Sequence, residues 1–72
     1  MNKEKLVDKM RRNGDTNASL ALYLGISPQS LSSKKNATNG AQFLAGEIIA
    51  IKRKYKLSAK DLNEIFFDEK QS

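Results

Sequence analysis

In the segment 28–35, the apolar residue Leu31 lies among side chains that can form hydrogen bonds. The side chains expected to face outward, all able to form hydrogen bonds, are those of Gln29, Ser32, Ser33 and Lys34. Glutamine can form a bidentate pair with adenine, and serine or lysine can reach base edges or phosphates. If the segment is a short helix, Leu31 faces a core and the polar side chains face outward, where they can enter a groove of DNA.

The residue types that the 72-residue chain lacks exclude most catalytic chemistry. There is no Cys and no His, which removes disulfides, Cys/His zinc sites, thiol nucleophiles and histidine acid–base catalysis. No nucleophile–base pair is recognisable among the remaining side chains. We therefore expect a protein that is not an enzyme and that needs no metal and no cofactor. The lack of Cys also favours a reducing compartment, the cytoplasm.

The distribution of charge favours a polyanionic partner. The net charge is +5, from 13 basic and 8 acidic residues. Eleven of the basic residues but only four of the acidic residues lie in 1–56, so a basic body precedes a mildly acidic end. This asymmetry suits nucleic acid, and a merely solvated surface is the alternative. No apolar run approaches the roughly 20 residues of a membrane span, so no membrane partner is expected. Residues 1–10 lack the apolar stretch of a signal peptide.

The residues before the polar segment indicate a second helix. Thr16 is a suitable N-cap, and Leu20, Ala21 and Leu24 follow on one helical face. Gly25 stands where a helix ends with a residue in the left-handed conformation. We therefore expect Gly25 to have a positive φ.

The short connection between these two helices predicts a helix–turn–helix. Ser27 is the next N-cap, and Pro28 fits the first helical position, where its missing N–H costs nothing. Ile26 is expected to be a buried plug between the helices. Helices that cross steeply through such a turn need a small residue where their backbones approach and a residue tolerant of positive φ. Ala21 and Gly25 meet these needs.

The remaining sequence adds three helices and no alternating strand pattern. Apolar spacing predicts helices over about 3–12 and 45–55, and Ser58 caps a fifth helix. The composition of 36–42 is that of a loop. Asp15 is assigned to the turn after the first helix, without a chemical role.

The expected architecture is all-α: a compact bundle of five short helices in a single domain, 1–72, with a frayed end at about 68–72. Two stretches resemble a known family. The stretch "TNASLALYLGISPQSLSSK", residues 16–34, is similar to the helix–turn–helix of the Cro/phage-repressor (XRE) family. The stretch "EIIAIKRKYKLSAKDLNEIFF", residues 47–67, resembles the closing half of short members from phages of Gram-positive bacteria. The resemblance covers about 5–67 and implies a lambda-repressor-like domain that binds operator DNA as a dimer.

The resemblance also implies that Asn17, Gln29, Ser30 and Ser33 occupy DNA-facing positions, and the neighbouring polar and basic residues extend the expected contacts. Base contacts are expected from Gln29, Ser30, Ser33 and Lys34. Phosphate contacts are expected from Thr16, Asn17, Ser27, Ser32, Lys35, Asn36 and Asn39. Asn17 stands where the family usually has Gln, which keeps an amide for a phosphate oxygen. One of the adjacent Lys34 and Lys35 is expected to lay its stem on the core and send its ammonium group outward.

The apolar end of the chain is the expected dimer surface, with Ile65 and Phe67 as contacts.

The combined expectation is a cytoplasmic, sequence-specific transcriptional regulator of phage or prophage type. Its third helix is expected to read the major groove of a double-stranded operator. The operator is expected to be an inverted repeat bound by a homodimer. This homodimer forms either in solution or only on DNA. Two alternatives stay open. One is a protein-interaction module of the antirepressor or antitoxin type with weak DNA binding, and the other is a non-specific binder of nucleic acid, including RNA.

Overall fold

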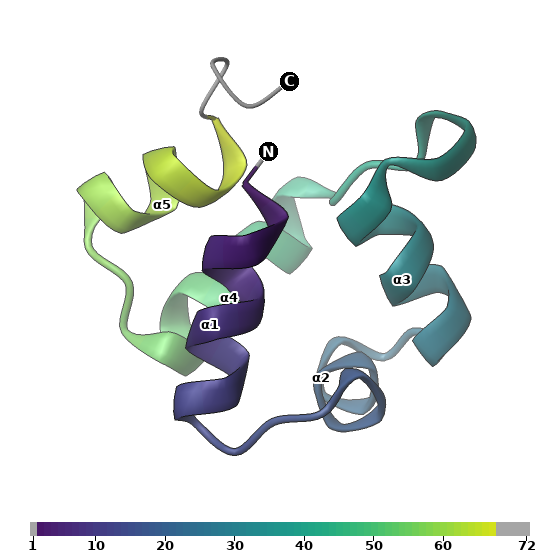
Figure 1. Cartoon of the computed structure of the whole chain (residues 1–72), viewed down its shortest axis with the longest axis horizontal. Coiled ribbons are helices and arrows are strands. Elements are labelled where there is room, and N and C mark those ends of the chain that lie inside the picture. Colours follow the sequence, from purple (N-terminus) through teal and green to yellow (C-terminus); the bar gives the residue numbers. More distant parts are fainter. Residues whose placement is uncertain (1, 68–72) are drawn as a thin grey trace.

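The structure describes residues 2–67, apart from the side chain of Asn39, and in this range the chain is all-helical. The computed structural model contains five α-helices, one 3₁₀ helix and no strand among these residues (Figure 1). The elements are α1 (Lys3–Arg12), α2 (Asn17–Leu24), α3 (Pro28–Asn36), η1 (Thr38–Gly40), α4 (Ala45–Tyr55) and α5 (Ala59–Phe66). The all-α class with five helices is confirmed, whereas the expected frayed end at 68–72 lies outside the described residues. No helix in 2–67 is long and apolar enough to cross a membrane.

Side-chain caps set where α2, α3 and α5 begin, as the sequence predicts. Thr16, Ser27 and Ser58 each accept a hydrogen bond from the backbone N–H three residues further on, at 3.0–3.1 Å. Asp61 completes a capping box, because its carboxylate accepts the N–H of Ser58 at 3.4 Å. These caps satisfy backbone donors that have no partner inside the helix.

The core lies where α1 crosses the middle of the molecule in front of α4, with α5 and α3 on opposite sides (Figure 1). Its buried members come from all five α-helices and from the turn before α5: Leu6, Met10, Leu20, Ala21, Leu31, Ile51, Tyr55, Leu57 and Ile65. Each of the short helices α3 and α5 contributes one of these residues, Leu31 and Ile65 respectively. Their remaining side chains are half-buried or exposed, so each of these two helices is held to the core by one fully buried side chain.

The turn between α2 and α3 has the predicted conformation. Gly25 adopts φ +74°, and the N–H of Ile26 bonds to the carbonyl of Ala21 at 3.0 Å, so the left-handed glycine ends α2. The prediction of a positive φ is therefore confirmed. The prediction that Ile26 is buried is wrong, because this side chain is only half-buried. It sits between the exposed residues Gly25 and Ser27 on a surface turn, and only part of it packs against the core.

Asp15 connects the turn after α1 to α4, which the sequence did not predict. Its carboxylate accepts hydrogen bonds from the hydroxyl groups of Tyr55, at 2.7 Å, and Ser19, at 2.8 Å. The ammonium group of Lys54 lies 3.5 Å away. The bond from Tyr55 is the main cause that lowers the pKa of Asp15, and burial together with this carboxylate raises the pKa of the Tyr55 phenol.

Candidate nucleic-acid interface

Helix α3 lies at the edge of the molecule with its first turn open to solvent (Figure 1). Leu31 is its one buried residue, whereas Pro28, Gln29 and Ser30 are exposed. The helix packs chiefly against α2, with which it makes its most extensive contacts. This arrangement places the first turn of α3 where it can meet another molecule.

The two exposed polar residues of that turn differ in how they are engaged. The amide of Gln29 forms no hydrogen bond within residues 2–67, so both its donor and its acceptor remain available. The hydroxyl of Ser30 lies 3.0 Å from that of Ser27, which also caps the helix. Ser33 is half-buried one turn further on. Among the residues expected to contact bases, Gln29 is therefore the freest.

Asn17 joins α2 to α3 instead of presenting a free amide. Its Nδ2 donates to the carbonyl of Pro28 at 2.8 Å and to the hydroxyl of Ser32 at 3.1 Å. Both hydrogens of the amide are thus engaged within the protein, so the structure does not leave them free for the expected phosphate contact. Its Oδ1 is buried and has no hydrogen-bond partner among the described residues. The half-buried hydroxyl of Ser32 accepts from Asn17 and keeps its own proton to donate.

Lys34 is the second expected contact that the structure places differently. Its ammonium group lies 2.6 Å from both carboxylate oxygens of Glu47 on α4, and the two side chains are only 16% and 10% exposed. The same carboxylate accepts the N–H of Leu44 at 2.8 Å, which caps α4. Lys34 is therefore not the lysine that sends its ammonium group outward, because a buried ammonium group and a buried carboxylate must each have a partner of opposite charge.

A group of cations and an amide forms at the C-terminal end of α3. Lys35 is half-buried, and Lys3 of α1 donates from Nζ to the Oδ1 of the exposed Asn36 at 2.7 Å. Burial lowers the pKa of Lys35, and the neighbouring charge of Lys3 lowers it further. Two cations held together in this way favour an anion beside them. Lys3 lies far from α3 in sequence, so the pattern alone did not place it here. The side chain of Asn39 lies outside what the structure describes.

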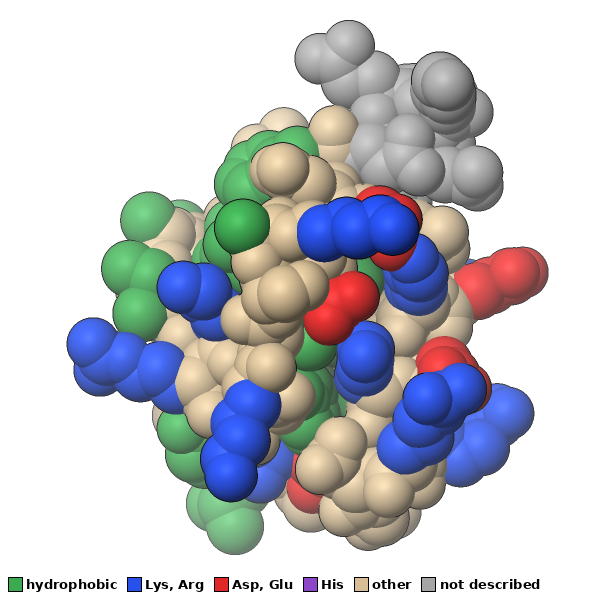
Figure 2. All heavy atoms as spheres, turned by 90° about the vertical axis from the view of Figure 1, so that its left-hand side faces the viewer, with side chains coloured by type: hydrophobic (Ala, Val, Ile, Leu, Met, Phe, Trp, Pro, Cys, Tyr) green, Lys and Arg blue, Asp and Glu red, His purple; other side chains and the backbone are tan. Residues whose placement is uncertain are grey.

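The charge around α3 is one-sided. From Thr16 to Gly46 the chain contains no Asp and no Glu, and its only charged residues are Lys34 and Lys35. The face opposite α3 differs, because Asp and Glu side chains lie between the Lys and Arg side chains there (Figure 2). Within residues 2–67, no group of three or more acidic, Cys or His side chains is placed to hold a metal ion. The region around α3 therefore suits a polyanion better than a metal or a cation.

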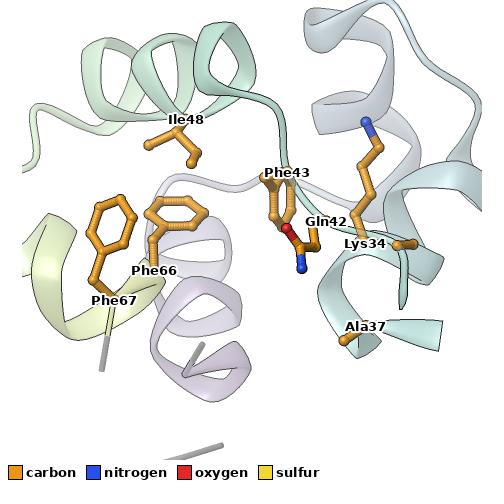
Figure 3. Close-up of a pocket in the computed structure, with 8 residues that line it drawn as sticks. Lys34, Ala37, Gln42, Phe43, Ile48, Phe66 and Phe67 are labelled. Atoms are coloured by element: carbon orange, nitrogen blue, oxygen red, sulfur yellow. The ribbon is translucent and has the colours of Figure 1, made fainter. Parts of the chain in front are cut away.

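The two residues expected at a dimer surface have different environments. Ile65 is fully buried in the core, so the expectation that it contacts a second copy is wrong. Phe67 is 58% exposed and lines a surface pocket of about 360 Å³. In that pocket Phe66 and Phe67 extend from the end of α5 toward Ile48, with Phe43 beside them (Figure 3). The rings of Phe43 and Phe66 meet edge to face at 5.4 Å between centroids. This end of the molecule therefore offers an apolar surface around Phe67.

Thr16 and Ser27, two of the expected phosphate contacts, cap the helices α2 and α3. Thr16 is exposed, but its hydroxyl caps α2 and its own N–H donates to Ser19 at 2.9 Å. Ser27 is exposed and caps α3. Ala21 is fully buried within α2, and Gly25 ends this helix in the left-handed conformation.

The chain matches no protein-family profile, no curated protein and no solved structure.

Proposed function

We propose that this protein is a sequence-specific, double-stranded DNA-binding transcriptional regulator of the Cro/repressor type. In this proposal α2, the turn at Gly25 and α3 form a helix–turn–helix. The observation that carries the proposal is the first turn of α3, where an unengaged Gln29 is exposed in a region free of carboxylates from Thr16 to Gly46. A region of this kind can approach a polyanion without repulsion and hydrogen-bond to its bases.

The contacts divide into base reading and positioning. Gln29 and Ser30 enter the major groove with the first turn of α3, where a glutamine amide can pair with adenine. Lys35 and Lys3 neutralise phosphates at the other end of the helix, the amide NH2 of Asn36 donates to a phosphate oxygen, and these contacts fix the register of the helix. Asn17 acts indirectly, since its two hydrogen bonds set the angle between α2 and α3. Lys34 also acts indirectly, through its pair with Glu47.

A homodimer follows from the size of the proposed interface. One α3 helix covers a few base pairs, and a single small domain with a few phosphate contacts binds DNA near the non-specific level, with Kd on the order of 10⁻⁴ to 10⁻⁶ M. Symmetric pairing doubles the site and places the two helices about 34 Å apart on an inverted repeat. We assign the pairing to the exposed Phe67 at the end of α5, without Ile65.

The test starts by selecting DNA sites from a random library, followed by affinity measurements on the preferred site and on random DNA. Gln29→Ala should weaken binding to the preferred site by about 1–3 kcal/mol and relax selectivity at one base pair. Lys35→Ala should weaken binding to all sequences and reduce the salt slope by about one. Asn63→Ala is the matched control, because this exposed amide lies on α5.

Each of the following results would contradict a part of the proposal. Binding without a sequence optimum, or equal binding of RNA, would favour a non-specific nucleic-acid binder. Negligible binding to any DNA at low salt would favour the protein-interaction alternative. Equal losses for Gln29→Ala and Asn63→Ala would remove Gln29 as a base reader. A one-to-one complex on a selected site in sedimentation, unaffected by Phe67→Asp, would contradict the dimer.

A further inference from the structure

A second surface, between α2 and α4, is not used by the core or by the proposed function. We call it the α2–α4 surface, and it consists of Tyr23, Leu44, Gly46, Ile49 and Ala50. Leu44 is 65% exposed, Tyr23 50% and Ile49 49%. All of these residues except Ile49 line one shallow depression of about 370 Å³. Large apolar side chains gathered around a depression are typical of an interaction site.

Helix α4 has two apolar stripes, which is unusual for a surface helix. One stripe, which includes Ile51 and Tyr55, faces the core. The other consists of Gly46, Ile49 and Ala50, at i, i+3 and i+4, and faces outward. Gly46 leaves open space, because a Cβ built on it would meet nothing within 4 Å. The outward stripe therefore offers a low floor on which another helix can lie closely.

The rim of the α2–α4 surface is positively charged. Arg53 continues the outward stripe at i+7 from Gly46, and it is exposed together with Lys52. Neither of them forms an ion pair with any other residue of 2–67. The ammonium group of Lys54 lies 4.6 Å from the ring centroid of Tyr23, at the edge of the depression. Hydrophobic side chains and cations also lie together along the left-hand edge of Figure 2, the side on which α4 lies.

No free carboxylate balances these cations at the α2–α4 surface. Glu47 lines the depression, but its carboxylate is paired with Lys34 and is largely buried. Asp15 is engaged by Tyr55, Ser19 and Lys54. The α2–α4 surface therefore combines an apolar floor with a rim on which the charges of Lys52 and Arg53 are not balanced by any described carboxylate.

We infer that the α2–α4 surface binds an acidic amphipathic helix of another protein. An apolar stripe on such a helix fills the depression, and its flanking Asp and Glu side chains pair with Arg53 and Lys52. A second copy of this chain fits less well, because its own α2–α4 surface carries the same cations. DNA would leave the exposed Leu44 and Ile49 without an apolar partner. The inference does not depend on the proposed DNA binding.

The test is an NMR titration of the uniformly ¹⁵N-labelled full chain with synthetic helical peptides. The first peptide carries leucines at i, i+3, i+4 and i+7 with glutamates on both flanks. The second keeps the leucines and replaces every glutamate with lysine, and the third keeps the glutamates and replaces every leucine with serine. The first peptide should give saturable shifts of the amides of Tyr23, Leu44, Gly46, Ile49 and Ala50. The other two should not.

Two variants and one control locate the binding. Ile49→Glu should weaken the first peptide about tenfold or more, because it removes an apolar contact and adds a repelling charge. Arg53→Glu, at an exposed position without an ion pair to any described residue, should weaken it about three- to tenfold without affecting the fold. Lys60→Glu makes the same charge change at an exposed position on α5 and should leave binding unchanged.

Several outcomes would overturn the inference. These are the absence of saturable shifts with the acidic peptide, equal binding of the lysine peptide, and shifts confined to α3. Shifts of the same five amides on raising the protein concentration without peptide would instead identify a second copy as the occupant. Because no DNA is present, failure of this titration and failure of the DNA-binding proposal are separate results.

Discussion

The α2–α3 pair and the bundle of α1, α4 and α5 are held together by different interactions. In the bundle, charged side chains of α1 and α5 pair with each other: Lys5 pairs with Glu64, and Lys9 with Asp61 at 3.7 Å. In the α2–α3 pair, hydroxyl caps and the amide of Asn17 make neutral hydrogen bonds, and neither helix contains an acidic residue.

This difference shows how a small basic protein can separate stability from binding. Acidic side chains are concentrated where ion pairs join helices. Regions without acidic side chains therefore retain a positive electrostatic potential that can attract a partner. Lys34 lies at the boundary, because it belongs to α3 but is paired with Glu47 of α4. Substitutions on the two sides of this boundary should therefore have different effects.

The largest effect is expected at the single apolar anchor of α3. Leu31→Ala removes a fully buried side chain and should lower the free energy of unfolding by about 3 kcal/mol. Leu22→Ala is the matched control, since Leu22 is 81% exposed and its loss should change the free energy by less than about 0.5 kcal/mol. Urea denaturation measures both. Equal effects of the two substitutions would mean that Leu31 does not hold α3 to the core.

The second-largest loss of stability is expected at the Lys34–Glu47 pair, which is largely buried, unlike an ordinary surface ion pair. Lys34→Met leaves the largely buried Glu47 without its cation and should cost about 2–3 kcal/mol, less than for a completely buried pair. Adding Glu47→Gln removes the stranded charge while an amide oxygen can still accept the N–H of Leu44. The double variant should therefore recover most of the loss in urea denaturation. A double variant that is less stable than Lys34→Met would contradict this account.

Tyr55→Phe should lower stability by about 2 kcal/mol near neutral pH, because it removes a hydrogen bond to a charged carboxylate. The pKa of Asp15 is lowered in the folded state, so its contribution is present above its unfolded pKa, about 3.9, and is lost as the pH falls through the folded value. The stability difference between Tyr55→Phe and the parent should therefore be largest near pH 6 and narrow below about pH 4. Denaturation curves measured across this range would contradict the role of Asp15 if the difference stayed constant.

The smallest effect is expected at the turn of the α2–α3 pair. Gly25→Val forces a β-branched residue into φ +74° and should cost about 1–2 kcal/mol from backbone strain alone, because nothing lies within 4 Å of its Cβ. Gly46→Ala is the contrasting control, since Gly46 is helical and its substitution should stabilise by up to about 0.5–1 kcal/mol. The melting temperatures of Gly25→Val, Gly46→Ala and the parent protein measure these effects. An unchanged melting temperature for Gly25→Val would contradict the role of the glycine.

Helix positions, caps and the turn were predictable because local chemistry determines them. Thr16, Ser27 and Ser58 each cap a helix as predicted, since a hydroxyl needs only a backbone N–H three residues away. The conformation of Gly25 followed from the same local reasoning. The environments of Ile65 and Ile26 were assigned wrongly, because apolar character alone does not say how much of a side chain the neighbouring helices cover.

What the sequence by itself determined is the class of fold, the start of each capped helix and a carboxylate-free region from Thr16 to Gly46. Only the tertiary structure decided which polar groups of that region remain available. Lys34 and Asn17 resemble free contacts in sequence, but Glu47 is 13 residues from Lys34 and Pro28 is 11 residues from Asn17. Such partners meet only when helices pack, because burial makes an unpaired polar group costly and draws it toward the nearest complementary group.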